Sequence, residues 1–179
     1  MTDPKVITRH ATIEDAQFIA LLGRITFTET FGHFFRDRQD LLTYFDATFS
    51  VDKIEKSITN PNNVYWISFV NRLPVGFAKL KLNSHPNAFG LHASEKVCQL
   101  QKIYVLKDFI SQKIGAALQN RLLEKARSEG FEKIWLSVLE SNERAKSFYV
   151  KHGFEQIGVH GYQIGKEKFN FMAMSKVLQ

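Results

Sequence analysis

The sequence predicts a single α+β domain built around a mixed β-sheet. The length of 179 residues suits one compact domain, and I/V/F-rich segments with alternating polarity are interspersed with segments of helical periodicity. Their expected order is strand, helices, three strands of antiparallel type, and then strand, helix, strand, helix, strand, strand. The strand–helix–strand step in the second half predicts two parallel strands joined by a right-handed crossover.

The N-terminal third predicts one strand followed by helices. Thr12 and Asp15 resemble a capping box before the first helix, and Ser50 stands where an N-cap of a later helix belongs. Apolar residues recur three and four positions apart in the segments that follow these caps. The expected elements are a strand at 5–9 and helices at 11–27, around 38–47, and at 50–58.

The remainder predicts a hairpin followed by alternating strands and helices. The stretch NRLP is a turn signal between two apolar runs. Gly130 and Gly153 stand where helices should end, and Asn142 stands where one should begin. The expected elements are strands at 64–70, 75–82, 96–106 and 133–139, helices at 111–130 and 142–153, and two closing strands after residue 153.

Composition excludes several classes of protein. The formal net charge is +6, but Lys and Arg are dispersed, which argues against nucleic-acid binding. No segment approaches the roughly 18 unbroken apolar residues of a membrane span, and the first residues lack the apolar core of a secretion signal. With one cysteine the chain forms no internal disulfide, so a cytoplasmic location is expected. The six histidines show no metal-ligand spacing, and no metal is expected.

The stretch IYVLKDFISQKIGAAL, residues 103–118, joins a strand to a helix. A helix N-terminus in that position offers free N–H groups and the positive end of a dipole, which together bind phosphate. Phosphate loops usually contain several glycines, whereas this one contains only Gly115. Taken alone, the stretch is compatible with a phosphate-binding loop or with an ordinary strand-to-helix connection.

A second motif follows at the correct distance. The segment NERAKSFYVKHGF fits the pattern N-x-x-A-x-x-F-Y-x-x-x-G-F, and on this basis the chain resembles the GNAT N-acetyltransferases. The resemblance implies a GNAT-like fold: a central mixed, mostly antiparallel twisted sheet of about seven strands flanked by helices, with a splayed strand pair at the coenzyme slot. It implies one domain over 1–179, with acceptor-side helices in 1–62 and a coenzyme-binding core in 96–154. The matching residues are Asn142, Ala145, Phe148, Tyr149, Gly153 and Phe154.

The resemblance also implies acetyl-CoA as cosubstrate and assigns its contacts. Backbone N–H groups of the strand are expected to meet the acetyl and pantetheine parts, and those of the following loop to surround the pyrophosphate. Ser111 and Lys113 replace glycines of the family pattern, and Lys113 would be strained if its φ angle were positive. A register shifted by two residues instead satisfies Q-x-x-G-x-A. The expected cofactor-binding residues are Ile103, Tyr104, Val105, Ile110, Ser111, Gln112, Lys113, Ile114, Gly115, Ala116 and Asn142.

Catalytic roles follow from the same resemblance. Tyr149 matches the family residue that donates a proton to the departing thiolate, and a core tyrosine packed on the sheet is the alternative. Asn142 can contact the coenzyme or simply cap its helix. Where related sequences carry a glutamate before the strand motif, this chain has Gln99, which cannot accept a proton. The base is therefore left open among a water chain, Glu95, Glu140 and His160.

The expected acceptor is a small-molecule primary amine that attacks the thioester directly in a ternary complex. A G-x-H-x-Y-x-x-G stretch over Gly158–Gly165 resembles the bacterial spermidine/spermine N-acetyltransferase branch, which makes a polyamine one candidate. The alternative is a non-catalytic coenzyme-A-binding or regulatory relative. Relatives often form homodimers, so a homodimer is also considered. The acceptor candidates are Phe27, Glu29 and Phe31, with Asp37 and Asp40 as further carboxylates and Phe34, Phe35 and Tyr44 as further apolar wall.

Overall fold

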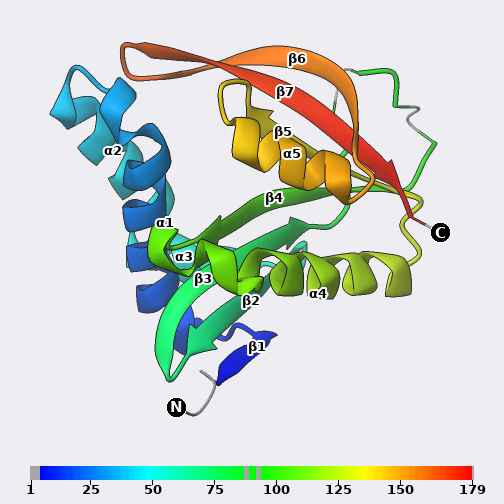
Figure 1. The fold of residues 1–179 in the computed structure, drawn as a ribbon, viewed down its shortest axis with the longest axis horizontal. Coiled ribbons are helices and arrows are strands. Elements are labelled where there is room, and N and C mark those ends of the chain that lie inside the picture. Colours follow the sequence, from blue (N-terminus) through cyan, green and yellow to red (C-terminus); the bar gives the residue numbers. More distant parts are fainter. Residues whose placement is uncertain (1–4, 87–88, 92–93, 179) are drawn as a thin grey trace.

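The computed structural model describes residues 5–86, 89–91 and 94–178. Its centre is a seven-stranded sheet in the order β1-β2-β3-β4-β5-β7-β6 (Figure 1). All neighbouring strands are antiparallel except β4 and β5, which are parallel, so the predicted fold class is confirmed. The strands are β1 (Val6–His10), β2 (Asn63–Val70), β3 (Leu73–Lys81), β4 (Val97–Val105), β5 (Lys133–Leu139), β6 (Glu155–Ile164) and β7 (Glu167–Val177).

Helices cover both faces of this sheet. The N-terminal helices α1, α2 and α3 pack on one face, and α4 and α5 pack on the other. Because side chains alternate across each strand, the sheet separates two apolar clusters. The helices are α1 (Ala16–Phe31), α2 (Arg38–Phe49), α3 (Val51–Ile58), α4 (Ile114–Ser128) and α5 (Glu143–Lys151), with short 3₁₀ turns η1 (Ile13–Asp15), η2 (Gly32–Phe34) and η3 (Lys107–Gln112).

Strands β4 and β5 pair over a short stretch and then diverge. Their ladder runs from Val97 opposite Lys133 to Gln99 opposite Trp135. Beyond it, β4 stays paired with β3 as far as Val105, while β5 stays paired with β7 as far as Leu139. The outer neighbours therefore hold the two strands apart. The splayed pair expected from the sequence is present.

Helix α4 begins later than the sequence predicted. The expected helix covered 111–130, but residues 107–112 form a 3₁₀ turn and the α-helix starts at Ile114. Lys113, between them, has φ 60° and ψ 15°, in the left-handed region. A residue in that conformation cannot belong to a right-handed helix, which separates the two segments. The suspected strain at Lys113 is therefore real.

Two of the three expected caps form as the sequence indicated. The backbone N–H of Thr12 donates to Asp15 at 2.8 Å, and the backbone N–H of Ala145 donates to the side chain of Asn142 at 3.1 Å. Arg9 adds two hydrogen bonds to Asp15, which hold the pKa of that carboxyl below its usual value and tie β1 to η1. Ser50 occupies its N-cap position, but its side chain forms no capping hydrogen bond.

One polar side chain is enclosed in the core beneath α4. Gln119 is 0% exposed, and both polar atoms of its amide lack a hydrogen-bond partner among the described residues. Its neighbours on the same helix face, Leu118 and Leu122, are also fully buried. An unsatisfied buried amide costs free energy because it has lost its water without gaining a partner.

We expect Gln119→Met to stabilise the protein. Methionine has a similar shape and carries no group that needs a partner, so the free energy of unfolding should rise by about 1–2 kcal/mol in urea denaturation. Asn120→Met is the matched control, since Asn120 is exposed on the same helix and its replacement should change stability by less than about 0.5 kcal/mol. A loss of stability in Gln119→Met would mean that the amide is satisfied by internal water.

Candidate active site

A cleft with a volume of about 1050 Å³ opens where β4 and β5 diverge. It is lined from both sides of the sheet, by α1 and α2 at one end and by η3, α4 and α5 at the other. It collects most of the residues predicted to contact ligands; those outside the lining are Phe35, Asp37, Asp40, Gln112 and Ile114, and Ile114 is fully buried at the start of α4. The predicted residues in the lining are Phe27, Glu29, Phe31, Phe34, Tyr44, Ile103, Tyr104, Val105, Ile110, Ser111, Lys113, Gly115, Ala116, Asn142 and Tyr149.

The N-terminus of α4 faces this cleft through Gly115 and Ala116. The first N–H groups of an α-helix have no partner within the helix, so they can bind an anion. A Cβ at Gly115 would meet only one neighbour, Val105 Cγ2 at 4.0 Å, which is an ordinary van der Waals contact. The missing Cβ therefore leaves room for a ligand against the backbone.

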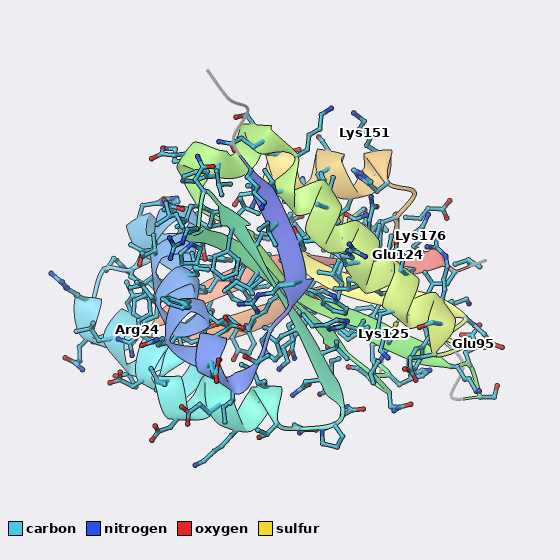
Figure 2. The ribbon with its side chains drawn as sticks, turned by 90° about the horizontal axis from the view of Figure 1, so that it is seen from below. Arg24, Glu95, Glu124, Lys125, Lys151 and Lys176 are labelled. Carbon is cyan, nitrogen blue, oxygen red and sulfur yellow. The ribbon has the colours of Figure 1, made fainter. Side chains whose placement is uncertain are left out.

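Cationic side chains surround that helix terminus. Lys113 precedes α4, while Arg144 and Lys151 belong to α5, and all three line the cleft. Figure 2 shows Lys151 projecting outward from α5. This end of the cleft therefore suits a ligand that carries phosphates. Arg144 was missed from the sequence because nothing distinguishes it there from an ordinary solvated arginine.

Tyr149, on α5, lines the cleft. The side chain is 7% exposed, and its ring packs edge-on against Phe148 and Phe154 at centroid distances of 5.4 and 5.6 Å. Burial raises the pKa of the Tyr149 phenol well above its ordinary value. The phenol therefore keeps its proton at neutral pH and can donate it to a stronger base formed in the cleft.

Of the three candidate bases, His160 is the one connected to the cleft. Its Nε2 is 2.8 Å from Oγ of Ser137, a cleft-lining residue of β5, and its ring stacks on Phe171. Glu95 is held in an ion pair with Lys133, and Glu140 is exposed outside the lining. The pairing of Ser137 with His160 could not be read from the sequence, because β7 lies between their strands in the sheet but follows both in the chain.

Gln99, which stands where a glutamate was expected, lies outside the cleft lining. Its amide oxygen accepts a hydrogen bond from Ser84 Oγ at 3.0 Å. The residue sits in the paired part of β4, opposite Trp135 of β5. It therefore has a structural contact of its own at the last pair of the β4–β5 ladder, and its side chain does not line the cleft.

Aromatic side chains of α1 and α2 form the opposite end of the cleft. Phe27 stacks on Phe31 at 4.4 Å and packs against Tyr44 at 4.6 Å. The hairpin of β6 and β7 reaches across to α2 (Figure 1). Its tip is attached by an ion pair between Lys166 and Asp37 at 2.7 Å. The acceptor-side residues predicted from the sequence are thus gathered beneath one hairpin.

The three carboxylates considered for binding a cationic amine already have partners. Glu29 accepts a hydrogen bond from the backbone N–H of Lys107 at 3.2 Å. Asp37 pairs with the side chain of Lys166, and Asp40 accepts a hydrogen bond from the backbone N–H of the same lysine at 2.8 Å. These carboxylates brace α1 and α2 against the rest of the fold.

Lys102 is a cleft residue that the sequence analysis overlooked. It is half-buried on β4, with its Nζ 5.1 Å from the ring centre of Phe49 and 5.8 Å from that of Tyr104. Burial lowers the pKa of its ammonium group to about 8. The sequence does show a lysine inside the apolar run LQKIYV. Its position in the cleft could not be predicted, because its surroundings include α2, which is far away in the sequence.

The described part of the chain contains no cluster of three or more His, Cys, Asp or Glu side chains arranged to hold a metal ion. Within the same residues, none of the helices combines the length and the apolar character needed to cross a bilayer.

Comparison with known proteins gives consistent results. The model of the acetyltransferase (GNAT) family matches residues 27–154. An uncharacterized N-acetyltransferase of Lactobacillus delbrueckii subsp. lactis is 27% identical over 90% of this chain and 91% of its own. The aminoalkylphosphonate N-acetyltransferase of Salmonella typhimurium is 28% identical over 83% of this chain and 84% of its own.

Solved structures agree in fold. The PaiA N-acetyltransferase of Thermoplasma acidophilum, in complex with coenzyme A, superposes with a TM-score of 0.72 at 20% identity, covering 97% of this chain and 99% of that one. A GNAT acetyltransferase of Streptococcus pneumoniae superposes with a TM-score of 0.71 at 22% identity, covering 98% of this chain and 100% of that one. The match of the family model over most of the length, together with these relatives, shows that the chain belongs to the GNAT family of acetyl-CoA-dependent N-acetyltransferases.

Proposed function

We propose that this enzyme transfers the acetyl group of acetyl-CoA to the primary amine of a small molecule, by direct attack in a ternary complex. The observation that carries the proposal is the cleft through the divided sheet, which has a cationic helix terminus at one end and an aromatic pocket at the other. Two ligands can enter such a cleft from opposite faces and meet between β4 and β5. Direct transfer requires the thioester of one ligand to lie next to the amine of the other.

The coenzyme fits the side formed by residues 96–154. The N–H groups at the start of α4, the missing Cβ at Gly115, and Lys113, Arg144 and Lys151 suit its phosphates. The freed backbone of β4 at residues 103–105 suits its pantetheine. Residues 1–62 then supply the acceptor side. A cytoplasmic location belongs to the same proposal, because the single Cys98 is a buried free thiol, as suits a reducing compartment.

Within this proposal, Tyr149 donates a proton, and Ser137 and His160 together accept one. Acetyl-CoA supplies the activated thioester, and Tyr149 protonates the thiolate that leaves. On the acceptor side, Ser137 donates its hydroxyl proton toward Nε2 of His160 while it accepts a proton from the attacking amine. The base is therefore His160, which lies behind Ser137 and reaches the cleft only through that hydroxyl.

The acceptor has two candidate classes. The sequence likeness to spermidine/spermine N-acetyltransferases suggests a polyamine. The printed name of the Salmonella typhimurium relative suggests an amine that also carries an acid group. Both classes present a primary amine, so the proposed reaction is common to them.

A non-catalytic coenzyme-binding relative is the alternative. Two features motivate it: Ile110, Ser111 and Lys113 depart from the usual loop pattern, and Gln99 stands where a glutamate base was expected. Backbone donors do not depend on side-chain identity, so those departures leave the helix terminus able to bind an anion. Tyr149 and Ser137 line the same cleft, and Ser137 is within hydrogen-bond distance of His160 behind it, which favours catalysis.

Replacing Lys113 separates its backbone strain from its charge. We expect Lys113→Gly to raise the free energy of unfolding by up to about 1 kcal/mol, because glycine adopts φ 60° without strain. Acetyl-CoA should bind about three- to fivefold more weakly, because a phosphate loses its cation. Lys113→Asn, which tolerates the same backbone conformation, should reproduce the loss of affinity in calorimetric titrations. Tighter binding by either variant would show that the lysine obstructs the coenzyme.

Tyr149→Phe tests the proposed reaction. With a panel of primary amines, thiol release from acetyl-CoA should fall about 100-fold in kcat, because the departing thiolate loses its proton donor. Affinity for acetyl-CoA should remain within about twofold, since the ring is kept. Tyr65→Phe makes the same chemical change at a buried tyrosine outside the cleft and should leave kcat unaltered. A fully active Tyr149→Phe enzyme would remove the assigned role, and absence of thiol release with every amine would refute the reaction.

His160→Gln tests the relay. Glutamine can still hydrogen-bond to Ser137 but cannot accept a proton, so kcat/KM should fall by about 100-fold or more near neutral pH. The acidic limb of the pH–rate profile, which arises when an imidazole base becomes protonated, should disappear. His85→Gln, outside the cleft lining, should keep the wild-type profile. An unchanged acidic limb in His160→Gln would assign the base elsewhere.

A further inference from the structure

The cleft is lined by many more cations than anions. Among the described residues, Glu29 is its one carboxylate, and that group already accepts a hydrogen bond from the backbone of Lys107. The proposed binding of the coenzyme phosphates explains the cations at the end of the cleft formed by α4 and α5. The basic side chains of the lining are Lys102, Lys107, Lys113, Arg144 and Lys151, apart from two histidines.

Lys102 lies on the other face of the sheet, away from those phosphates. The rings of Phe49 and Tyr104, over which its Nζ lies, belong to the apolar cluster formed with α1, α2 and α3. The helix terminus of α4 packs instead with the opposite cluster. The ammonium group of Lys102 is therefore on the side where the acceptor is proposed to enter.

Among the residues that the structure describes, the groups around Lys102 supply no counter-charge. On β3, Lys79 pairs with Lys102 across the ladder, and Lys81 follows it. Lys53 of α3 also faces Lys79, while Glu29 of α1 is engaged with a backbone N–H. Burial lowers the pKa of both Lys79 and Lys102 to about 8, with like charges adding to the effect at Lys79. A buried cation without an anion is unfavourable unless a ligand provides one.

We infer that the acceptor carries an acid group beside its primary amine, and that Lys102 binds this acid group. The inference rests on the proposed function and specifies its substrate class: an aminoalkyl carboxylate, phosphonate or phosphate ester. A polyamine would bring a second cation to a site whose carboxylate is engaged and whose ammonium repels it. An acid group would pair with Lys102 and leave the amine free to reach the divided strands.

Equilibrium binding tests this without requiring turnover. With coenzyme A present, 2-aminoethylphosphonate should bind the wild-type protein at least about tenfold more tightly than propylamine or spermidine in calorimetry. Lys102→Met should lose that preference while still binding propylamine as before. Lys79→Met removes a neighbouring lysine that also has a pKa of about 8 but does not line the cleft. This variant should keep the preference for 2-aminoethylphosphonate. Tighter binding of spermidine by the wild type, or equal weakening of all ligands in Lys102→Met, would overturn the inference.

Proton uptake provides a readout that needs no variant. An anion next to Lys102 restores its ordinary protonation, so binding of 2-aminoethylphosphonate at pH 8 should take up roughly half a proton. Comparing calorimetric enthalpies in buffers of different ionisation enthalpy measures this number, after allowance for the phosphonate itself. Lys102→Met should abolish the uptake, and Lys102→Arg should restore tight binding without it. Binding with no uptake by the wild type would place the acid group elsewhere.

Kinetics distinguish failure of this inference from failure of the reaction. If propylamine and spermidine release thiol from acetyl-CoA at least as efficiently as 2-aminoethylphosphonate and β-alanine, the reaction stands and the acid-group assignment falls. If 2-aminoethylphosphonate binds through Lys102 but no amine releases thiol, the assignment stands and the reaction falls. We expect kcat/KM for the acid-bearing amines to exceed that for propylamine by about tenfold or more, and Lys102→Met to abolish the difference.

Discussion

The separation of β4 from β5 is the constraint on which the rest of this structure depends. A parallel pair inside a sheet normally stays hydrogen-bonded along its length, because an unpaired buried backbone is costly. Here the ladder ends at Gln99 and Trp135, although both strands continue. The antiparallel ladders to β3 and β7 persist on the outer sides and hold the strands apart. A bulge at Gln101, which has no ladder partner between Leu100 and Lys102, bends β4 at the point where the cleft opens.

Under the proposed function, this division assigns the two faces to two ligands. Each face has its own apolar cluster, so a ligand on one face is shielded from a ligand on the other except through the opening. The β6–β7 hairpin and α2 are joined at their exposed tips by pairs such as Arg36 with Glu167 and Lys166 with Asp37. At the base of α2, Arg24 of α1 lies between the helices and bonds to Asp46 at 3.1 Å (Figure 2). These exposed ion pairs add little stability individually, and their effect is to fix the outline of the acceptor pocket.

Local signals were sufficient for the fold and for one side of the site. The segment from Asn142 to Phe154 carries its cap, its helix face and its terminating glycine within one short stretch, so its sequence could be interpreted without tertiary information. The structure confirmed the strands and the parallel pair for the same reason. It also showed that the backbone of Lys113 is left-handed, whereas the sequence indicated only that a positive φ at this residue would cause strain. Lys102 and the Ser137–His160 pair could not be predicted, because their surroundings come from α2 and from the order β5-β7-β6.

The same burial has opposite consequences for the acids and bases of the cleft. It disfavours the charged form of every group, so it raises the pKa of Tyr149 and Tyr104 and lowers that of Lys102. The two phenols consequently remain proton donors throughout the physiological range. The lysine is partly neutral until an anion reaches it. Under the proposed function, this arrangement would keep a neutral acid for the leaving thiolate, and Lys102 would become fully charged when an acid-bearing ligand is bound. Burial would then couple occupancy of the proposed acceptor pocket to the electrostatics of the point of transfer.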